Sequence, residues 1–317
     1  MNILCTAPFE ERHKKLVEAA AVGCRVKFRS NDAVEKADAD EADIIIGNIP
    51  PRLLDASPRL RLLQLVSAGA DGYTLPGVLH PDTVLANATG AYSKTVSEHA
   101  LALTLSLLKK LYLYRDGQNR AEWRDRGAVG SLADSTVLVV GLGDIGRSYA
   151  RLVKSLGAYV IGVKRRASDR PDCVDELYLT EDILKALPRA DVVFSILPGT
   201  AATACFYTEE MFAAMKPEAL FINCGRGNAV ASELLYRVLS EGRIQAAAID
   251  VAETEPLPGD SPLWALENLV ITPHVSGGFH IPDTLDEVAR IAAGNIGAVL
   301  EGRPVRNAVD LSTGYKR

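Results

Sequence analysis

The stretch VLVVGLGDIGRSYARLVKSLG, residues 137–157, decides the fold of the chain around it. An apolar run, a Gly-x-Gly-x-x-Gly loop and a helix pattern with one apolar face follow one another. In such a unit the first glycine permits a tight turn, the second lets the backbone approach a diphosphate, and the third lets helix and strand pack closely. The glycines are Gly141, Gly143 and Gly146. A dinucleotide's phosphates are expected at the positive end of the helix, near the amides of Asp144 and Ile145.

The next predicted strand ends in positive charge where a dinucleotide-binding fold usually carries an acid. In VIGVKRRA (160–167), Lys164 lies 18 residues past Gly146, and Arg165 and Arg166 follow it. An acid about 20 residues after the loop binds the ribose 2′-hydroxyl of NAD, whereas lysine and arginine attract the 2′-phosphate of NADP. The sequence therefore favours NADP(H). A solvated charge cluster, with NAD(H) still used, is the alternative.

Apolar strands alternate with helix patterns along most of the chain, which predicts two doubly wound parallel sheets covered on both faces. The first series has a helix at 10–22 and strands at 1–7, 43–47, 60–66 and 83–87. One long helix at 96–114 and a polar connector at 115–134 follow. The second series has a final helix at 282–300 and strands at 135–140, 158–163, 191–197, 219–223, 246–251 and 268–272.

Length and composition narrow the class of protein. A chain of 317 residues can form two domains, and 48% hydrophobic with 24% charged residues is typical of a soluble globular protein. The net charge of −5 argues against a nucleic-acid-binding surface. The five cysteines show no metal-ligand spacing, so reduced thiols and no metal site are expected. Without a membrane-spanning stretch or a secretory signal, we expect a cytoplasmic protein with no membrane partner.

Polar residues follow three predicted strands of the second series, at the edge where open α/β sheets bind ligands. The guanidinium of Arg226 can bind a carboxylate or carbonyl, and His274 can exchange a proton near neutral pH. Glu255 can hold that imidazole and favour its protonated form. Each residue alone would more often be an ordinary surface or strand-end residue, but their joint pattern predicts an acid/base pair with a substrate clamp. The motifs are FINCGRG (221–227), AIDVAETEPL (248–257) and VITPHVSGG (270–278).

The other histidines have no such context. His13, His80 and His280 are expected on the surface or in loops, and His99 is expected to be a structural residue of the long helix.

Together these motifs resemble the D-isomer-specific 2-hydroxyacid dehydrogenase family, which includes glyoxylate/hydroxypyruvate reductases, phosphoglycerate dehydrogenases and formate dehydrogenases. The resemblance covers nearly the whole chain and extends to LVSAGADGY (65–73), NATGAYSKTVSEHALAL (87–103) and ILPGTAAT (196–203). It implies a Rossmann cofactor domain, residues 98–282, inserted in a flavodoxin-like substrate domain, residues 1–97 and 283–317. It also implies a homodimer formed through the cofactor domain.

The resemblance implies hydride transfer between a nicotinamide cofactor and a small 2-oxo or 2-hydroxy acid. Arg226, Glu255 and His274 match the family's catalytic positions, and His274 would give a proton to the substrate carbonyl. Asp250 resembles the acid that binds the cofactor's carboxamide. The substrate would be held by Arg226, His274 and the backbone around Ser67, Ala68 and Gly69. The cofactor would also contact Leu197, Pro198, Thr203, Cys224, Arg226, His274 and Gly277.

Two matters stay open in the sequence. A dinucleotide-sensing corepressor of the same fold is the alternative function, although the compact chain shows no long disordered tail. Formate or phosphite oxidation is a weaker rival. Glyoxylate and hydroxypyruvate lead among the substrates, and larger 2-oxo acids are not excluded. Side chains that could shape the substrate pocket are Asn48, Ile49, Tyr73, Tyr92, Phe279 and His280.

Overall fold

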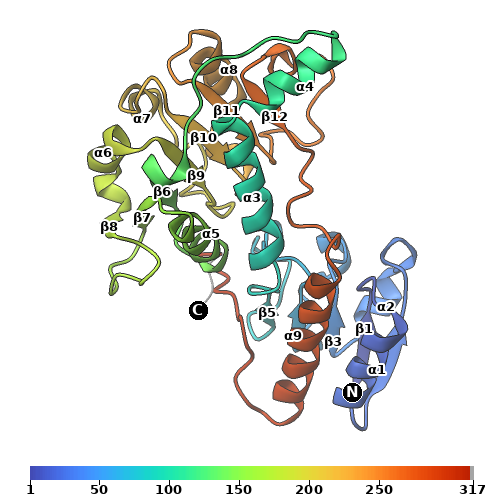
Figure 1. Ribbon diagram of the computed structural model, residues 1–317. Coiled ribbons are helices and arrows are strands. Elements are labelled where there is room, and N and C mark those ends of the chain that lie inside the picture. The colour runs from blue at the N-terminus through green and yellow to red at the C-terminus, as the bar shows by residue number, and fades with distance from the viewer. Residues whose placement is uncertain (315–317) are drawn as a thin grey trace. The chain divides into compact units, whose positions relative to one another are not determined.

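The computed structural model describes residues 1–314, and the chain divides into two compact units (Figure 1). Unit 1 comprises Met1–Tyr92 and Phe279–Arg317, and unit 2 comprises Ser93–Gly278. The last three residues of the predicted segment 283–317 lie outside the described residues.

Unit 1 is built on a five-stranded parallel sheet. Its elements are β1 (Asn2–Cys5), α1 (Glu11–Ala20), β2 (Arg25–Phe28), α2 (Lys36–Asp40), β3 (Ile44–Ile46), β4 (Leu62–Gln64), β5 (Val84–Ala86) and α9 (Pro282–Leu300). The strand order is β2-β1-β3-β4-β5, which is the flavodoxin-like order with its switch point between β1 and β3. The three isoleucines of β3 are fully buried because side chains on both faces of this central strand are covered.

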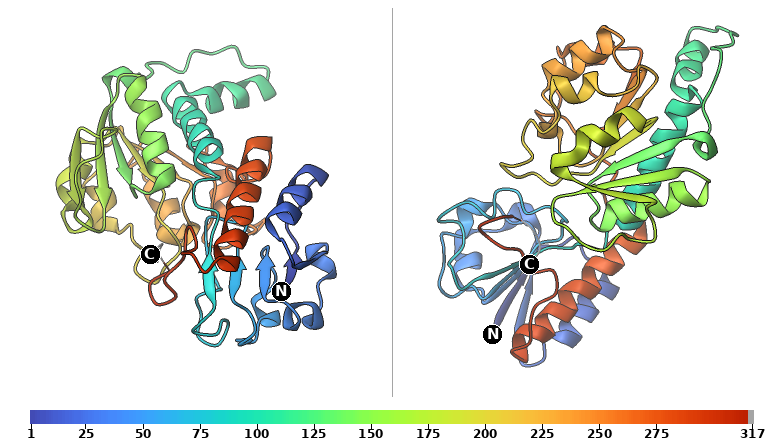
Figure 2. Two further views of the ribbon diagram at one scale, coloured as in Figure 1. Left: turned by 90° about the horizontal axis from the view of Figure 1, so that it is seen from below. Right: turned by 90° about the vertical axis from the view of Figure 1, so that its left-hand side faces the viewer.

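Helices α1 and α9 pack side by side, as the two views of Figure 2 show. His13 of α1 is buried at this contact, and its Nε2 lies 2.7 Å from Oδ1 of Asp286 in α9. The hydrogen bond from His13 and the charge of Arg12 hold the pKa of Asp286 below its usual value. The expectation that His13 lies on the surface is therefore wrong, because the imidazole joins two helices far apart in sequence.

The segment after α9 returns to the sheet of unit 1. Ala308 forms an antiparallel bridge with Ala86, and the N–H of Val309 donates to the carbonyl of Leu85 at 2.7 Å. The buried side chain of Asn307 donates to the carbonyl of Thr89 at 2.7 Å. The β5 edge and the residues after it are thus fixed by the other end of the unit.

Unit 2 is built on a seven-stranded parallel sheet, and residues 109–131, which include one helix, form an arm of this unit. Its elements are α3 (Ser93–Leu108), α4 (Leu111–Asn119), β6 (Thr136–Val140), α5 (Asp144–Ser155), β7 (Tyr159–Lys164), β8 (Glu176–Leu179), α6 (Ile183–Ala186), β9 (Val192–Ser195), α7 (Glu209–Ala213), β10 (Leu220–Asn223), α8 (Ser232–Ser240), β11 (Ala246–Ile249) and β12 (Leu269–Ile271). The order β12-β11-β10-β9-β6-β7-β8 is that of a Rossmann fold, with its switch point between β6 and β9. The prediction of two doubly wound parallel sheets is confirmed.

Helices cover both faces of this sheet (Figure 2). On one face Tyr149 of α5 stacks on Phe194 of β9 with ring centroids 4.1 Å apart, and α3 packs beside α5. Neighbouring side chains of a strand point to opposite faces, so Val193 joins the core that α6, α7 and α8 cover. Burial of each large apolar side chain contributes roughly 1.5–3 kcal/mol, which explains why β9 is apolar from Val192 to Phe194.

The long helix predicted at 96–114 is interrupted. Lys110 takes a left-handed conformation, with φ of 54°, so α3 ends at Leu108 and α4 begins at Leu111. The two lysines at the break bind the returning connector: Lys109 Nζ donates to the carbonyl of Gly130 and Lys110 Nζ to that of Arg126. The chain turns here because these contacts hold it to the connector.

Strands β2 and β8 were not predicted from the sequence. Both lie at an edge of their sheet, and most of their side chains are only half-buried. Charged residues are tolerated there, so the continuous apolar run that marks a central strand is absent. None of the helices within residues 1–314 combines the length and apolar character needed to cross a membrane.

Candidate active site

His274 and Glu255 form a hydrogen-bonded pair in unit 2. Nδ1 of His274 lies 2.7 Å from Oε2 of Glu255, and Oε1 of Glu255 accepts from the N–H of Ala252 at 3.0 Å. Both side chains are partly exposed, at 47% and 38%. Nε2 of His274 has no hydrogen-bond partner among residues 1–314. The carboxylate therefore orients the ring and leaves Nε2 able to exchange a proton with a ligand.

The turn that carries His274 is held in a strained conformation. His274 has φ of 53°, a left-handed geometry that costs a non-glycine residue roughly 1–2 kcal/mol. Its N–H donates to the carbonyl of Asp250 at 2.7 Å. Oδ1 of Asp250 accepts from the N–H of Val275 and Oδ2 from that of Ser276, each at 3.0 Å. Asp250 has no exposed side-chain surface, so it acts as an anchor for this turn, while its predicted contact with a cofactor stays a prediction.

Arg226 lies just beyond β10, and its backbone is fixed by tight packing. The side chain of Asn223 donates to the carbonyl of Arg226 at 3.0 Å and accepts from the N–H of Gly225 at 3.1 Å. A Cβ on Gly227 would lie 1.9 Å from the backbone of Ala252, so only glycine fits beside the β11 loop. Nη1 of Arg226 donates to the carbonyl of Gly225 at 2.9 Å, and the side chain is half-buried.

The sheet topology brings the three predicted catalytic residues to one edge. Arg226 follows β10, Asp250 and Glu255 follow β11, and His274 follows β12. These strands are parallel neighbours, so their carboxyl ends lie side by side. A guanidinium, a carboxylate and an imidazole at one edge can bind an anionic carbonyl compound and transfer a proton to it.

The glycine loop follows β6 at the switch point of the same sheet. A Cβ on Gly146 would lie 1.9 Å from the carbonyl oxygen of Gly141, so a larger residue would push α5 away from the strand. A Cβ on Gly143 would meet no atom within 4 Å, which leaves the space in front of the loop open. Within residues 1–314 the N–H groups of Gly143, Asp144 and Ile145 have no acceptor. Three free donors at a helix N-terminus fit the diphosphate of a dinucleotide.

The positive cluster lies where β7 ends. Lys164 is half-buried and its Nζ donates to Oγ of Ser168 at 2.6 Å, while Arg165 and Arg166 are exposed. β7 pairs with β6, so the cluster and the glycine loop lie at the carboxyl ends of adjacent strands. A 2′-phosphate on the adenosine ribose would be within the field of these charges.

The remaining predicted cofactor residues lie on loops at the same edge. Leu197 and Pro198 follow β9, and Oγ1 of Thr203 donates to the carbonyl of Pro198 at 2.5 Å, which closes that loop. Gly277 is half-buried and belongs to the segment just after His274. Cys224 follows β10 and is buried, and burial with the nearby charge of Asp250 raises the pKa of its thiol well above the usual value. The raised pKa lowers the thiolate fraction, so Cys224 is a poor nucleophile at neutral pH.

In unit 1 the loop with Ser67, Ala68 and Gly69 follows β4, and its carbonyl oxygens are all bound from within the unit. Asn87 donates to the carbonyl of Ala68 at 2.7 Å, Oγ of Ser67 donates to that of Gly69 at 2.7 Å, and the Tyr92 hydroxyl donates to that of Val66. The N–H of Ala88 donates to the carbonyl of Ser67 at 2.9 Å.

The amides of this loop are left unpaired. No acceptor among residues 1–314 is bonded to the N–H groups of Ser67, Ala68 or Gly69. Asn48, which follows β3, donates to Oγ of Ser67 at 2.9 Å and accepts from the N–H of Val66 at 2.9 Å, so it fixes the loop's entry. Consecutive unpaired amides form an anion-binding concavity, and a carboxylate fits it.

Three of the predicted pocket-shaping residues serve this scaffold. Asn48 and Tyr92 hold the loop directly, and the Tyr73 hydroxyl donates to the carbonyl of Ile49 at 2.9 Å. Burial raises the pKa of Tyr73 to about 12, so its hydroxyl stays protonated. The sequence reasoning missed Asn87, whose signal was a polar residue directly after the buried strand β5.

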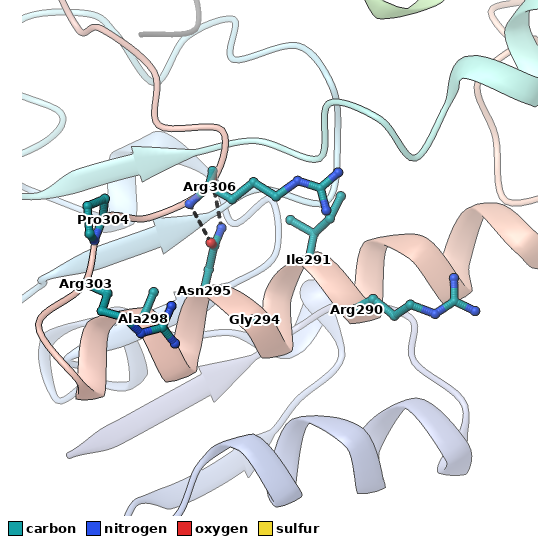
Figure 3. A pocket seen from close by; sticks show the side chains of 8 residues that line it. All are labelled: Arg290, Ile291, Gly294, Asn295, Ala298, Arg303, Pro304 and Arg306. Atoms are coloured by element: carbon teal, nitrogen blue, oxygen red, sulfur yellow. Dashed lines mark hydrogen bonds between the residues drawn. The ribbon is translucent and has the colours of Figure 1, made fainter.

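A separate pocket in unit 1 is lined by three arginines of α9 and the segment after it (Figure 3). Arg290 and Arg306 lie 3.0 and 3.5 Å from the two carboxylate oxygens of Glu287, and Arg303 lies 2.5 Å from Glu301. Asn295 points from α9 to the backbone of Arg306 and bonds both its N–H and its carbonyl. Because each guanidinium already faces a carboxylate, the pocket joins α9 to the final segment and offers no free anion site.

Comparison with known proteins relates this geometry to a family. The family model described as "D-isomer specific 2-hydroxyacid dehydrogenase, NAD binding domain" matches residues 101–276. A D-3-phosphoglycerate dehydrogenase of Methanocaldococcus jannaschii is 30% identical over 315 residues, which are 98% of this chain and 60% of that protein. The chain therefore spans about three fifths of that relative's length.

Two further proteins match along most of their length. A glyoxylate/hydroxypyruvate reductase B of Shigella boydii is 30% identical over 282 residues, with 85% of each protein covered. The crystal structure of an NADPH-dependent glyoxylate/hydroxypyruvate reductase of Sinorhizobium meliloti, in complex with NADP and sulfate, matches with a TM-score of 0.85 and 26% identity. That match covers 99% of both chains.

Proposed function

The chain belongs to the D-isomer-specific 2-hydroxyacid dehydrogenase family, and on that premise we propose that it reduces a small 2-oxo acid to the D-2-hydroxy acid, and catalyses the reverse reaction, with a nicotinamide dinucleotide. The observation that carries the proposal is the 2.7 Å bond between His274 and Glu255, with Nε2 of His274 unpaired. Glyoxylate and hydroxypyruvate are the substrates we favour, because relatives from Shigella and Sinorhizobium bear that name.

The cofactor would be held by the glycine loop and the strand ends beside it. The unpaired amides of Gly143, Asp144 and Ile145 would bind its diphosphate. When bound, the nicotinamide supplies the hydride. The lining residues would be Leu197, Pro198, Thr203, Cys224, Asp250 and Gly277.

Each predicted substrate-binding residue would have a separate role. His274, protonated and oriented by Glu255, would give its Nε2 proton to the carbonyl oxygen as the alcohol forms. The guanidinium of Arg226 would bind the same oxygen and stabilise its developing negative charge. The unpaired amides of Ser67, Ala68 and Gly69 would bind the carboxylate, which fixes the orientation of the 2-oxo group.

We propose that the cofactor is NADP(H). Support comes from Lys164, Arg165 and Arg166 at the end of β7, where the sequence carries lysine in place of the usual acid. The related Sinorhizobium reductase was crystallised with NADP.

We also propose that a second copy of this chain covers the arm of unit 2, residues 109–131. The arm exposes Leu111, Tyr114, Trp123 and Val129, and Trp123 is 104% exposed, which is unusual for an indole in a monomer. Light scattering of the purified protein should give a dimer, and Trp123→Ser with Leu111→Ser should shift it toward monomer. Trp264→Ser, at the other exposed tryptophan, serves as the control. A monomeric wild-type protein would refute the assembly.

A panel of 2-oxo acids, assayed with NADPH and then with NADH, tests the activity and the cofactor together. Glyoxylate or hydroxypyruvate with NADPH should give the highest kcat/KM. His274→Ala should lower kcat by about 10²–10⁴-fold, the usual size of general-acid catalysis. His80→Ala, at a histidine that pairs with Asp82 in a loop of unit 1, should leave kcat unchanged.

Two results of the panel would contradict the proposal. If His274→Ala kept full activity with every substrate, His274 would not be the proton donor. If the enzyme preferred NADH and Arg165→Ala left that preference unchanged, the positive cluster would not select NADP(H).

A further inference from the structure

Two side chains of α3 form hydrogen bonds with the turn that carries His274. Oγ1 of Thr95 donates to the carbonyl of Ser276 at 3.1 Å, and Nε2 of His99 lies 3.1 Å from Oγ1 of Thr272. Thr95 and His99 are four residues apart, so they lie on one face of the helix. Their partners are the residues two positions before and two positions after His274. The turn is therefore bound on both sides of the imidazole by one helix.

The hydrogen bonds of Thr272 fix the direction of this contact. Its hydroxyl lies 2.6 Å from Oδ1 of Asp250, and an ionised carboxylate can only accept, so the single hydroxyl proton points to Asp250. Oγ1 of Thr272 must then accept from His99, which carries its proton on Nε2. A continuous series of donors runs from His99 through Thr272 to Asp250, whose carboxylate also holds the amides of Val275 and Ser276.

Helix α3 also contacts α5, apart from the turn at 272–276. Between Thr95 and His99, Oγ of Ser97 lies 3.1 Å from Oγ of Ser148 in α5, and further along α3 Oγ1 of Thr104 lies 2.7 Å from the Tyr149 hydroxyl of α5. Leu103 and Leu107 of the same helix are buried. The helix is thus anchored on α5 independently of the turn at 272–276, which separates a positioning role from a purely structural one.

We propose that Thr95 and His99 are positioning residues, which set the orientation of the His274 imidazole by holding the turn at 272–276 from α3, together with the Asp250 carboxylate, whose Oδ1 lies 3.7 Å from Nε2 of His99. The proposal rests on the proposed function, because it needs His274 to be the proton donor. Neither side chain touches the imidazole, so both act through the backbone and through Thr272. Loss of either contact would let the strained turn relax and move Nε2 away from its working position.

The test compares removal of each contact with its conservative replacement. Thr95→Val and His99→Met remove the two donors, whereas Thr95→Ser and His99→Gln keep a donor at similar reach. Thr104→Val is the matched control, since it removes a hydrogen bond of the same helix that faces α5. Steady-state kinetics with glyoxylate and NADPH, and amide exchange of Val275 and Ser276 by mass spectrometry, are measured for each.

The two removals should each lower kcat about tenfold, with KM for glyoxylate within about twofold, because misplacement of a catalytic group acts on the reaction step. Exchange at Val275 and Ser276 should become faster in both. Thr95→Ser and His99→Gln should recover most of the lost kcat, and Thr104→Val should keep it. Unchanged kcat or unchanged exchange in the removals overturns the proposal, as does equal damage in the conservative pair.

Failure of the proposed function gives a different pattern. In that case His274→Ala would keep the wild-type kcat, while the exchange of Val275 and Ser276 would still report whether α3 holds the turn. A protein without activity on any 2-oxo acid would likewise reject the function but leave the exchange measurement decisive for the contacts.

Discussion

The two units present similar edges made of different chemistry. In unit 2 the ends of β10, β11 and β12 carry ionisable side chains, those of Arg226, Glu255 and His274. In unit 1 a loop with bound carbonyls and unpaired backbone amides follows β4, and asparagines that follow β3 and β5 contact it. Asn48 and Asn87 hold that loop. The same topological position therefore presents ionisable side chains in one sheet and unpaired backbone amides in the other, and in our proposal the first react while the second bind an anion.

The largest effect should come from the side-chain edge. Arg226→Gln removes the guanidinium that would stabilise charge on the carbonyl oxygen, so kcat/KM for glyoxylate should fall about 10²–10³-fold. Steady-state kinetics with NADPH measures it. Arg243→Gln, at a surface arginine paired with Glu209 and Glu241, should have no effect. Wild-type kinetics of Arg226→Gln would exclude that residue from the reaction.

A smaller effect of another kind should come from the backbone edge. Asn87→Asp keeps the shape of the side chain but replaces the donor to the Ala68 carbonyl with an acceptor, so the loop should turn its amides from their present direction. KM for the 2-oxo acid should rise about tenfold, because the loss of one hydrogen bond to the substrate weakens binding by about that factor. The value of kcat should stay within about twofold of the wild type.

Asn268→Asp is the control for this substitution, since its amide also donates to a backbone carbonyl, that of Leu239, but in unit 2. It should leave KM as it is. A large fall in kcat for Asn87→Asp, with KM unchanged, would mean that the loop takes part in the reaction step. The proposal that the unit 1 edge only binds the substrate would then be wrong.

The smallest effect concerns two buried thiols, one in each unit, that lie at or just beyond the carboxyl end of a strand. Cys5 ends β1, and burial raises its pKa to about 11. Cys224 follows β10, and burial raises its pKa as well. A raised pKa lowers the thiolate fraction at pH 8, so iodoacetamide should leave both unmodified in the folded protein while the exposed Cys205 reacts.

Mass spectrometry of the native and the denatured protein checks this prediction. All five cysteines should react after denaturation. Alkylation of Cys224 in the native protein would show that the β10 edge is more open than its burial indicates.

Much of the fold could be predicted because its central strands are buried on both faces. Runs such as Ile44–Ile46 and Val137–Val140 stay apolar at every position, and the helix at 282–300 follows from its apolar spacing. The edge strands β2 and β8 escaped because half of their surface faces water. The break at Lys110 escaped because contacts with the returning connector, absent from any local pattern, cause it.

The candidate site divides in the same way. Arg226, Glu255 and His274 could be named because each follows a strand and has chemistry of its own. Asn87, Thr95 and His99 could not, since their importance lies in which distant backbone group or hydroxyl they contact. Hydrogen bonds between residues far apart in sequence leave no periodic signal, so only coordinates reveal them.

The return of the chain to β5 after α9 has a consequence for biosynthesis. Ala308 pairs with Ala86, so the sheet of unit 1 joins pieces that a ribosome delivers on either side of unit 2. Unit 2 is one uninterrupted segment and can fold as it leaves the ribosome. Unit 1 cannot complete its fold, and α1 lacks its contact with α9, until residues 279–309 have been translated. During translation, the N-terminal segment of unit 1 is therefore the part of the chain that we expect chaperones to bind.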